Sequence, residues 1–191
     1  MAVKNFHDVL DFGLVELINR GAVGVLPTDT VYGLVAKADN LPAVKNLYKL
    51  KSRADKPGTI IAASIDQLVD LGIKRRYLTA VSQFWPGAVS VILPVGEQLH
   101  YLSQNLPTLA MRLPAGAKIN QLLEKTGPLL TTSANLPGQP PAENIAQAKN
   151  YFGARLDFYA DGGDLAGRQN STIIRIIDDA VEIVRAGAAK I

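Results

Sequence analysis

Cysteine is absent from the 191-residue sequence, and histidine occurs only twice, at His7 and His100. Without cysteine, disulfide scaffolds, cysteine zinc sites, iron–sulfur clusters and thiol nucleophiles are excluded. Two histidines are too few for a multi-histidine metal site, and we assign no metal-ligating residue. The chemistry of this protein is therefore left to hydroxyl, amide, carboxylate, lysine and arginine side chains.

Charge and long apolar runs are also scarce. Charged residues make up 19% of the chain and the hydrophobic set 48%, which excludes a disordered protein. No apolar run approaches the ~20 residues that span a bilayer, and acidic side chains interrupt the N-terminal apolar pattern where a secretory signal would have none. We expect a cytoplasmic protein that forms one domain over residues 1–191 and buries roughly 70% of its unfolded surface.

Apolar segments of strand length alternate with segments of helical periodicity. We expect helices near residues 5–20, 40–51, 64–72, 78–84, 119–125 and 143–152, and strands near residues 22–27, 59–64, 88–95, 108–114, 128–135 and 156–163, with a hairpin over 171–187. Asn5 should cap the first helix, and Ser64 with Gln67 forms a capping-box pattern. Because many strands are continuously apolar, we predict an α/β fold with a mixed sheet covered by helices.

Four of the predicted strands end in small polar clusters. These are Thr28-Asp29-Thr30, Arg112, Thr131 to Asn135, and Arg185-Ala186-Gly187. Ligands of open α/β sheets bind at strand ends, and hydroxyl and guanidinium groups together suit a carboxylate or phosphate ligand. Each cluster alone is more simply a turn or a helix cap, so the argument for a site depends on all four.

A basic loop follows the second predicted helix. Lys51, Arg53 and Lys56 place three cations within six positions, with only Asp55 opposing them. Such a group could neutralise a polyphosphate, and it could equally be a solvated helix end. A second basic run, Lys74-Arg75-Arg76, is more simply a solvated helix start than an RNA-binding patch.

Common nucleotide motifs are missing. The sequence has no GxxxxGK[ST] P-loop and no GxGxxG after a strand. The segment Asp161-Gly162-Gly163-Asp164 is typical of a turn, and a metal site there is the weaker interpretation.

The ordered motifs resemble the YrdC family of threonylcarbamoyl-AMP synthases over nearly the whole chain. The similar segments are PTDTVYGL (27–34), K-x-R (51–53) with K-P (56–57), WPG (85–87), MRLP (111–114), TTSANLPGQPP (131–141), STII (171–174) and VRAG (184–187). The sequence departs from the family pattern at Lys37, at Gly58, at Ala115 to Ala117 and in the final R-A-G. Gly58 stands where a bulky aliphatic residue is common.

The resemblance implies a YrdC-like twisted, mixed sheet flanked by helices, with a large concave, positively charged cavity. It also implies a nucleotidyltransferase that makes threonylcarbamoyl-AMP and pyrophosphate from L-threonine, bicarbonate or CO2, and ATP carrying Mg²⁺. The product would serve the modification of adenosine 37 in tRNA, through a TsaD-type transferase complex. By motif position, Lys51 and Arg53 would be catalytic. Arg53, Lys56, Ser133, Asn135 and Arg185 would bind the nucleotide, and Thr30, Arg112, Thr131 and Ser171 the threonine.

Two alternatives stay open. A non-catalytic RNA-binding module is suggested by the isoelectric point near 9.1, although a net charge of only +3 argues against it. A diverged family member acting on another substrate is also possible. A carbamoyl-AMP enzyme of hydrogenase maturation is disfavoured by the chain length and the lack of cysteine.

Overall fold

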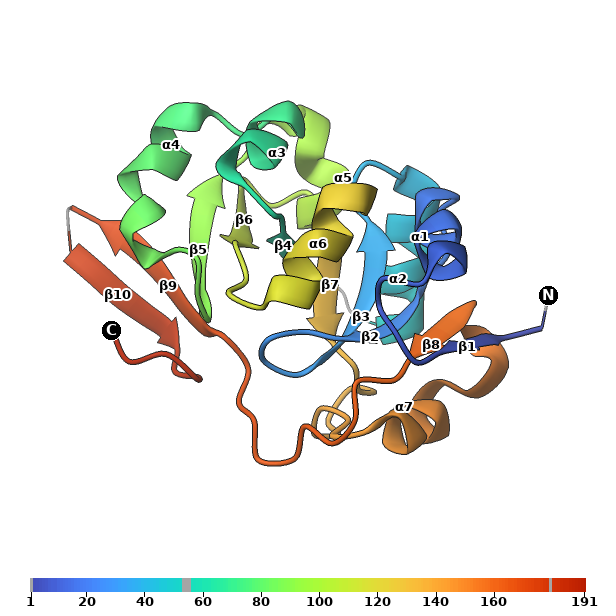
Figure 1. The fold of residues 1–191 in the computed structure, drawn as a ribbon. Helices are drawn as coiled ribbons and strands as arrows, with labels where there is room; N and C mark the ends of the chain where they lie inside the picture. Colours follow the sequence, from blue (N-terminus) through green and yellow to red (C-terminus); the bar gives the residue numbers. More distant parts are fainter. Residues whose placement is uncertain (1, 53–55, 179) are drawn as a thin grey trace.

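The computed structural model describes residues 2–52, 56–178 and 180–191, and the fold is built around one ten-stranded sheet (Figure 1). The strand order is β1-β8-β2-β3-β7-β4-β6-β5-β9-β10. The strands are β1 (Lys4–Phe6), β2 (Gly24–Pro27), β3 (Tyr32–Lys37), β4 (Thr59–Ile61), β5 (Val89–Pro94), β6 (Thr108–Arg112), β7 (Leu129–Ser133), β8 (Phe158–Ala160), β9 (Thr172–Ile177) and β10 (Ala180–Arg185).

Parallel and antiparallel neighbours are mixed in this sheet. β8 is parallel to both β1 and β2, β4 to β6, and β5 to β9, while the other neighbouring pairs are antiparallel. The predicted α/β fold with a mixed sheet is confirmed.

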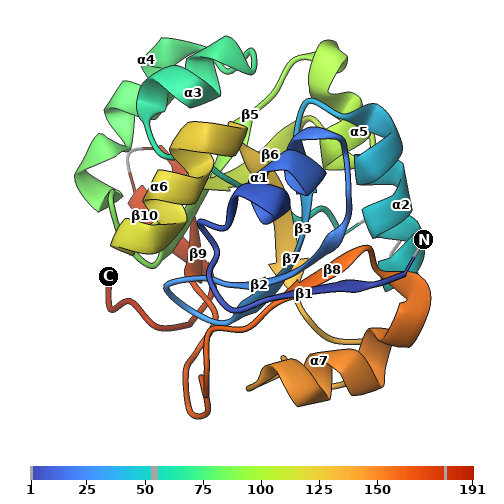
Figure 2. The same ribbon diagram turned by 45° about the vertical axis from the view of Figure 1, so that its right-hand side comes forward.

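Helices cover both faces of the sheet. The helices are α1 (Phe12–Asn19), α2 (Leu41–Lys51), α3 (Ile65–Asp70), α4 (Arg75–Ala80), α5 (His100–Ser103), α6 (Ala117–Thr126) and α7 (Ile145–Phe152), with short 3-10 turns at Ser82–Phe84, Glu97–Leu99 and Gly153–Arg155. α1 and α6 pack side by side on one face (Figure 2). Their buried side chains form one core with alternate residues of the strands, and α2, α3, α4, α5 and α7 contribute to the core on the other face.

The first helix begins later than the sequence predicts. Asp11, not Asn5, caps α1, and its side chain accepts a hydrogen bond from the Gly13 N–H at 2.7 Å. Asn5 instead lies in β1, which pairs with β8 at the sheet edge. A short edge strand before a helix leaves no distinct signal, because its few residues fit the helical pattern as well. The Ser64 cap is confirmed, since Ser64 Oγ accepts from the Gln67 N–H at 3.2 Å.

β3 is a strand that the sequence analysis missed. The polar segment at residues 28–30 hides it, because the chain turns back there and enters β3 at Tyr32. β3 pairs with both β2 and β7, so it lies inside the sheet and not at an edge. The loop between β2 and β3 therefore begins and ends on neighbouring strands.

The predicted hairpin over residues 171–187 is confirmed as β9 and β10, with β10 at the free edge of the sheet. Several of its apolar side chains are exposed, including Ile183 at 50% and Val184 at 48%. Among the described residues, no helix has the length and apolar character needed to cross a bilayer.

Candidate functional site

Polar side chains from several strands project from the same face of the sheet. Leu129 belongs to the core beneath α1 and α6, and Thr131 and Ser133 follow it on the same face because side chains alternate along a strand. Arg112 is the register partner of Ile61, which also belongs to that core. Thr131, Ser133 and Arg112 therefore continue the α1–α6 face beyond its apolar part.

These side chains line a small cavity of about 80 Å³, which we call the hydroxyl cavity. Its lining residues are Thr28, Val31, Gly33, Pro57, Gly58, Thr59, Arg112, Thr131, Thr132, Ser133, Asn170, Ser171, Ile173 and Arg185. Three of the four residues predicted to bind threonine, Arg112, Thr131 and Ser171, are among them. A cavity with hydroxyl groups and two guanidiniums suits a small polar ligand with a carboxylate.

A second cavity of about 430 Å³ adjoins the first, and we call it the cationic cavity. Its lining residues are Lys51, Ser52, Lys56, Ser133, Asn135, Pro137, Gly138 and Arg185. Among these described residues, three are cations and none is a carboxylate, which favours an anionic ligand. All the described residues predicted to bind the nucleotide line this cavity. Ser133 and Arg185 line both cavities.

Lys51 holds the loop that follows β7. Its side chain, at the end of α2, is 4% exposed, and Nζ donates to the Ser133 carbonyl at 3.0 Å and to the Asn135 carbonyl at 2.5 Å. Nζ also donates to Asn135 Oδ1 at 2.9 Å, and the same oxygen accepts from Ser133 Oγ at 2.7 Å. The K-x-R lysine and the S-x-N residues thus form one hydrogen-bonded unit. A direct role for Lys51 in the reaction stays a prediction.

Arg185 joins the end of β10 to the start of β9. Its Nη2 donates to the Ser171 carbonyl at 2.7 Å, and the Ser171 hydroxyl lies 2.8 Å from that of Ser90 on β5. Both serine side chains are buried. This contact places the Arg185 guanidinium where the two cavities meet.

Arg112 forms a buried ion pair with Asp29, a residue of the β2–β3 loop. Arg112 Nη1 lies 2.7 Å from Asp29 Oδ1 and 2.8 Å from Oδ2, and the two side chains are 3% and 10% exposed. Asp29 Oδ2 also accepts from the Ala115 N–H at 3.1 Å. Arg112 thus lines the hydroxyl cavity and also contacts the carboxylate of Asp29, which was not among the predicted site residues.

The hydroxyl of Thr30 forms a hydrogen bond within the β2–β3 loop. Thr28 Oγ1 donates its single proton to the Val31 carbonyl at 2.7 Å, so in the 3.0 Å contact between the two threonine hydroxyls Thr30 is the donor. Thr28 and Val31, rather than Thr30, are among the residues that line the hydroxyl cavity. A threonine-binding role for Thr30 stays a prediction.

Two glycines allow close approach of the backbone at the hydroxyl cavity. A Cβ at Gly33 would lie 2.6 Å from Thr131 Oγ1, and a Cβ at Gly58 would lie 2.6 Å from the Thr131 carbonyl oxygen. A real Cβ at position 33 would require the Thr131 side chain to move, and one at position 58 would require the β7 backbone to shift. A bulky aliphatic residue at position 58 would therefore not fit against β7 as the strand lies in this structure.

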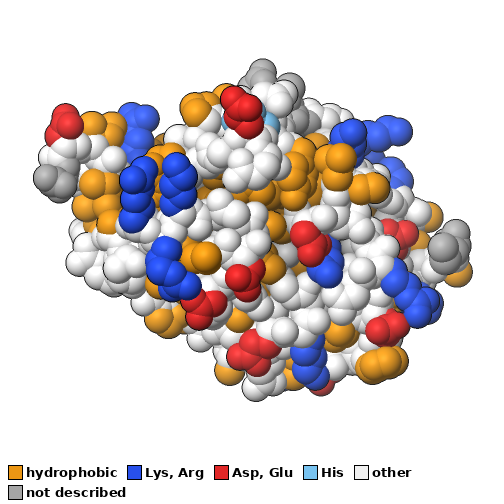
Figure 3. Space-filling view, turned by 90° about the horizontal axis from the view of Figure 1, so that it is seen from above, with side chains coloured by type: hydrophobic (Ala, Val, Ile, Leu, Met, Phe, Trp, Pro, Cys, Tyr) orange, Lys and Arg blue, Asp and Glu red, His pale blue; other side chains and the backbone are white. Residues whose placement is uncertain are grey.

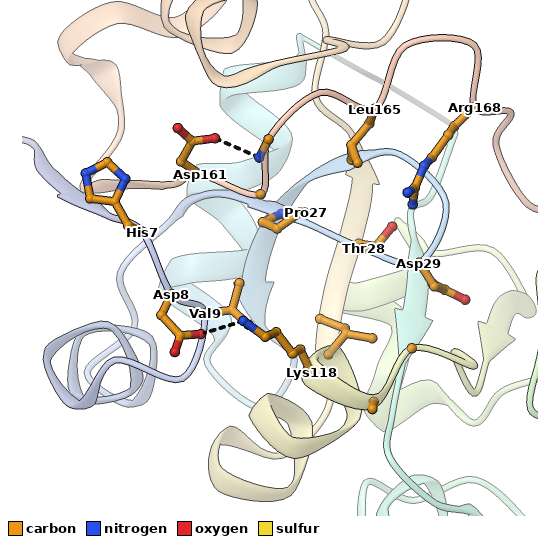
Figure 4. A pocket seen from close by; sticks show the side chains of 15 residues that line it. His7, Asp8, Val9, Pro27, Thr28, Asp29, Lys118, Asp161, Leu165 and Arg168 are labelled. Carbon is orange, nitrogen blue, oxygen red and sulfur yellow. Dashed lines mark hydrogen bonds and ion pairs between the residues drawn. The ribbon is translucent and has the colours of Figure 1, made fainter.

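A third cavity, of about 610 Å³, includes Thr28 and Asp29 of the β2–β3 loop, the start of α6 and the 161–168 segment (Figure 4). The Tyr32 hydroxyl fixes one wall, because it donates to the Gly163 carbonyl and accepts from the Gly162 N–H, each at 2.8 Å. Burial raises the pKa of Tyr32 above its ordinary value. These contacts tie down the segment at 161–164, which has no regular secondary structure; the turn that the structure describes here lies at residues 166–167.

The second basic run has partners at the surface. Arg75 Nη2 lies 2.5 Å from Asp66 Oδ1, and the Arg76 guanidinium lies 4.8 Å from the centre of the Tyr77 ring. Acidic and basic side chains are interspersed over the face seen from above (Figure 3). These contacts favour the solvated interpretation of residues 74–76 over an RNA-binding patch.

The site contains residues that the prediction omitted, and one predicted site residue lies outside the described part of the chain. Thr28, Thr59 and Asn170 line the hydroxyl cavity without having been assigned. Thr28 had a signal, since it belongs to a polar cluster at a strand end, whereas nothing in the sequence singles out Thr59. Arg53 lies outside the described residues, so its position in the site stays a prediction. The prediction that the site is one large, concave and positively charged cavity also stays a prediction.

Known proteins resemble this chain over most of its length. The sequence profile of the Sua5/YciO/YrdC family, described as "Telomere recombination", matches residues 16–187. A protein named threonylcarbamoyl-AMP synthase from Vibrio campbellii is 32% identical over 180 residues, covering 91% of this chain and 94% of that protein. One of the same name from Bacillus subtilis is 33% identical over 177 residues, covering 90% of this chain but only 51% of that protein.

Solved structures share the fold. The crystal structure of Pyrococcus abyssi Sua5 complexed with L-threonine superposes with a TM-score of 0.83 at 29% identity, covering 97% of this chain and 57% of that one. The crystal structure of Escherichia coli YciO gives a TM-score of 0.83 at 25% identity, covering 100% of this chain and 98% of that one. This chain thus spans about half the length of some relatives and nearly all of others. From the matched motifs, the profile and the shared fold, the chain belongs to the Sua5/YciO/YrdC family.

Proposed function

We propose that this chain is a threonylcarbamoyl-AMP synthase, a nucleotidyltransferase that joins L-threonine, bicarbonate and ATP into threonylcarbamoyl-AMP. The observation that carries the proposal is that the hydroxyl cavity and the cationic cavity adjoin at Ser133 and Arg185. Two ligands seated in these cavities would have their reacting ends together. The names of the relatives, and the threonine in the Pyrococcus abyssi structure, support the same activity.

Threonine is assigned to the hydroxyl cavity and ATP to the cationic cavity. An α-carboxylate suits the Arg112 guanidinium, and the amino acid's polar groups suit the hydroxyls of Thr131 and Ser171. The cationic cavity, with Lys56 and Arg185, suits a triphosphate, and its volume lies within the usual range for a small-molecule site.

The reaction needs positioning and charge neutralisation more than a protein nucleophile. The amine of threonine and bicarbonate form a carbamate with loss of water, and a carbamate oxygen then attacks the α-phosphorus of ATP. The new oxygen–phosphorus bond forms as the bond to pyrophosphate breaks, and pyrophosphate leaves with its electron pair. Arg185 lies where the cavities meet, so it can offset the charge that develops there, and Arg53 would add a second cation.

Mg²⁺ would enter with the triphosphate. No group of three or more histidine, aspartate or glutamate side chains suited to a metal ion occurs within residues 2–52, 56–178 and 180–191, and none of the cationic cavity's lining residues within those ranges is a carboxylate. The phosphate oxygens of ATP are therefore the expected ligands, and the metal would screen their charge.

The product would be consumed by a TsaD-type transferase complex that modifies adenosine 37 of tRNA. A mixed anhydride of a carbamate and AMP is hydrolysed readily, so a partner that accepts it promptly is chemically reasonable. A cytoplasmic location follows from the same proposal, because ATP, bicarbonate and tRNA meet there.

The proposal is tested by incubating the purified protein with ATP, Mg²⁺, bicarbonate and threonine. We expect pyrophosphate release that requires both threonine and bicarbonate, together with a product of the mass of threonylcarbamoyl-AMP. Serine and other amino acids in place of threonine separate this activity from that of a diverged family member. Absence of threonine-dependent pyrophosphate would refute the proposal, and tRNA binding with a steep salt dependence but no turnover would favour the RNA-binding alternative.

Arg185→Met supplies a site variant and Arg175→Met its matched control. Both arginines lie in the β9–β10 hairpin, but Arg175 pairs with Glu182 at 2.7 Å on an exposed face outside both cavities. Arg185→Met should raise the KM for both ATP and threonine, since Arg185 lines both cavities. Arg175→Met should leave both constants within about twofold of wild type, because an exposed ion pair contributes little.

A further inference from the structure

The Arg112–Asp29 pair raises a question about how the hydroxyl cavity binds a carboxylate. Both oxygens of Asp29 contact Nη1 of Arg112, and the Ala115 N–H holds Oδ2. Figure 4 shows Asp29 beside Thr28 on the β2–β3 loop, with its carboxylate turned away from the centre of the cavity drawn there. Asp29 is therefore fixed at the guanidinium before any ligand binds.

The pair fixes the orientation of the guanidinium. Arginine has five N–H donors in a planar fork, and Asp29 engages only those on Nη1. Among the described residues, neither Nε nor Nη2 of Arg112 has a hydrogen-bond partner, although Arg112 lines the hydroxyl cavity. The donors left for a ligand are thus on one defined edge of the fork. Without Asp29, rotation about the last side-chain bonds would spread them over several directions.

The pair also sets the charge of the cavity. The positive charge of Arg112 is compensated at hydrogen-bond distance, so this part of the hydroxyl cavity is close to neutral. Among the described residues that line the cationic cavity, three are cations, namely Lys51, Lys56 and Arg185. A polyanion such as the triphosphate of ATP is therefore attracted to the cationic cavity. A zwitterion with a single carboxylate loses little binding free energy in the nearly neutral part of the hydroxyl cavity.

We propose that Asp29 is a positioning and specificity-determining residue of the threonine subsite. It aims one edge of Arg112 at the amino-acid carboxylate, and it keeps phosphate groups out of the hydroxyl cavity by neutralising Arg112. The inference rests on the proposed function for the identity of the two ligands. Asp29 contacts no substrate in this scheme and acts only through Arg112.

The test is threonine binding measured by calorimetry without ATP, and then repeated with inorganic pyrophosphate present. Asp29→Asn keeps the size of the side chain but removes its charge. We expect threonine affinity to fall by at least about tenfold, because a charge-assisted contact loses its alignment. We also expect pyrophosphate to displace threonine from the variant at a concentration at least about tenfold lower than from wild type, because an uncompensated Arg112 attracts it.

Asp157→Asn is the matched control. Asp157 Oδ2 accepts from the Val23 N–H at 2.8 Å, so it is a structural carboxylate, and it lines neither the hydroxyl nor the cationic cavity. This variant should keep threonine affinity and pyrophosphate sensitivity within about twofold of wild type. Urea unfolding of each variant shows whether it is folded.

The outcomes are separable. If wild type binds no threonine, the proposed function fails. If wild type binds threonine and Asp29→Asn behaves like wild type, the inference is overturned. Weaker threonine binding with unchanged pyrophosphate sensitivity also overturns it, because a merely structural role predicts that result. Should Asp29→Asn not fold, Asp29→Glu keeps the charge but lengthens the side chain. It should weaken threonine binding while leaving pyrophosphate sensitivity unchanged, and unaltered threonine binding would contradict the positioning role.

Discussion

Replacing Lys51 with methionine should reduce both stability and nucleotide binding. Nζ of Lys51 has three acceptors on Ser133 and Asn135, and the side chain is 4% exposed. Hydrogen bonds to a charged group contribute about 1.5–3 kcal/mol each, but the variant also removes the cost of burying an ammonium. We therefore expect a net loss of about 2–3 kcal/mol, which lowers the Tm of a chain of this size by about 4–12 °C.

Urea unfolding followed by circular dichroism measures this loss, and ATP binding is measured in parallel. Lys45→Met is the matched control, since Lys45 lies on the same helix and is exposed. Lys56→Met is the functional contrast: Lys56 is an exposed residue of the cationic cavity, so its loss should weaken ATP binding while stability changes by no more than about 0.5 kcal/mol. If Lys51→Met unfolds at the same urea concentration as Lys45→Met, the reasoning is wrong.

Three further predictions concern single positions. Gly33→Ala should weaken threonine binding about tenfold and ATP binding less than twofold in calorimetry, because its Cβ would lie 2.6 Å from Thr131 Oγ1; equal effects on both ligands would contradict this. Arg112→Lys should raise the KM for threonine but not for ATP, since an ammonium cannot reproduce the fork; an unchanged threonine KM would count against it. Burial raises the pKa of Tyr159 from 10.0 to about 12, so on raising the pH the Tyr159 hydroxyl ionises in the unfolded chain before it ionises in the folded one. The free energy of unfolding should be constant with respect to Tyr159 below pH 10 and should fall between pH 10 and 12. If the burial of Tyr159 is the cause, the fall should be less steep in Tyr159→Phe.

The sequence predicts the elements whose signals are local. The cap at Ser64 and the hairpin around Asp178 depend on neighbouring residues, and both are found. β1 and β3 were missed for different reasons. β1 is three residues long and pairs with β8, far away in the chain, while β3 follows a polar loop that interrupts the apolar pattern. Pairings of this kind depend on tertiary packing, which periodicity does not report.

The sequence predicts several of the residues that line the two cavities, but not which of their side chains contact one another. The motif resemblance identified Arg112, Ser133 and Arg185, and each of the three lines the hydroxyl cavity, the cationic cavity or both. Asp29 was not assigned, because its partner is 83 positions away and the sequence gives no sign of the pair. Thr30 was assigned by the same motif, although its hydroxyl is engaged by Thr28. A motif shows which residues share a site, while the partner of each side chain is set by the fold.

Three described cations of the site, Lys51, Arg112 and Arg185, share one arrangement, which bears on how the site binds anions. Lys51 is held by carbonyl oxygens at the end of β7 and just after it, Arg112 by the carboxylate of the β2–β3 loop, and Arg185 by the carbonyl of Ser171 before β9. Each contact joins two of the ordered motifs, so the motifs bind one another before they bind a ligand. Side chains already fixed lose little conformational entropy when substrates arrive, and two anions can be aligned at a lower free-energy cost. On this view, a substitution at any one of these contacts should disturb ligand binding at a neighbouring motif as well as at its own.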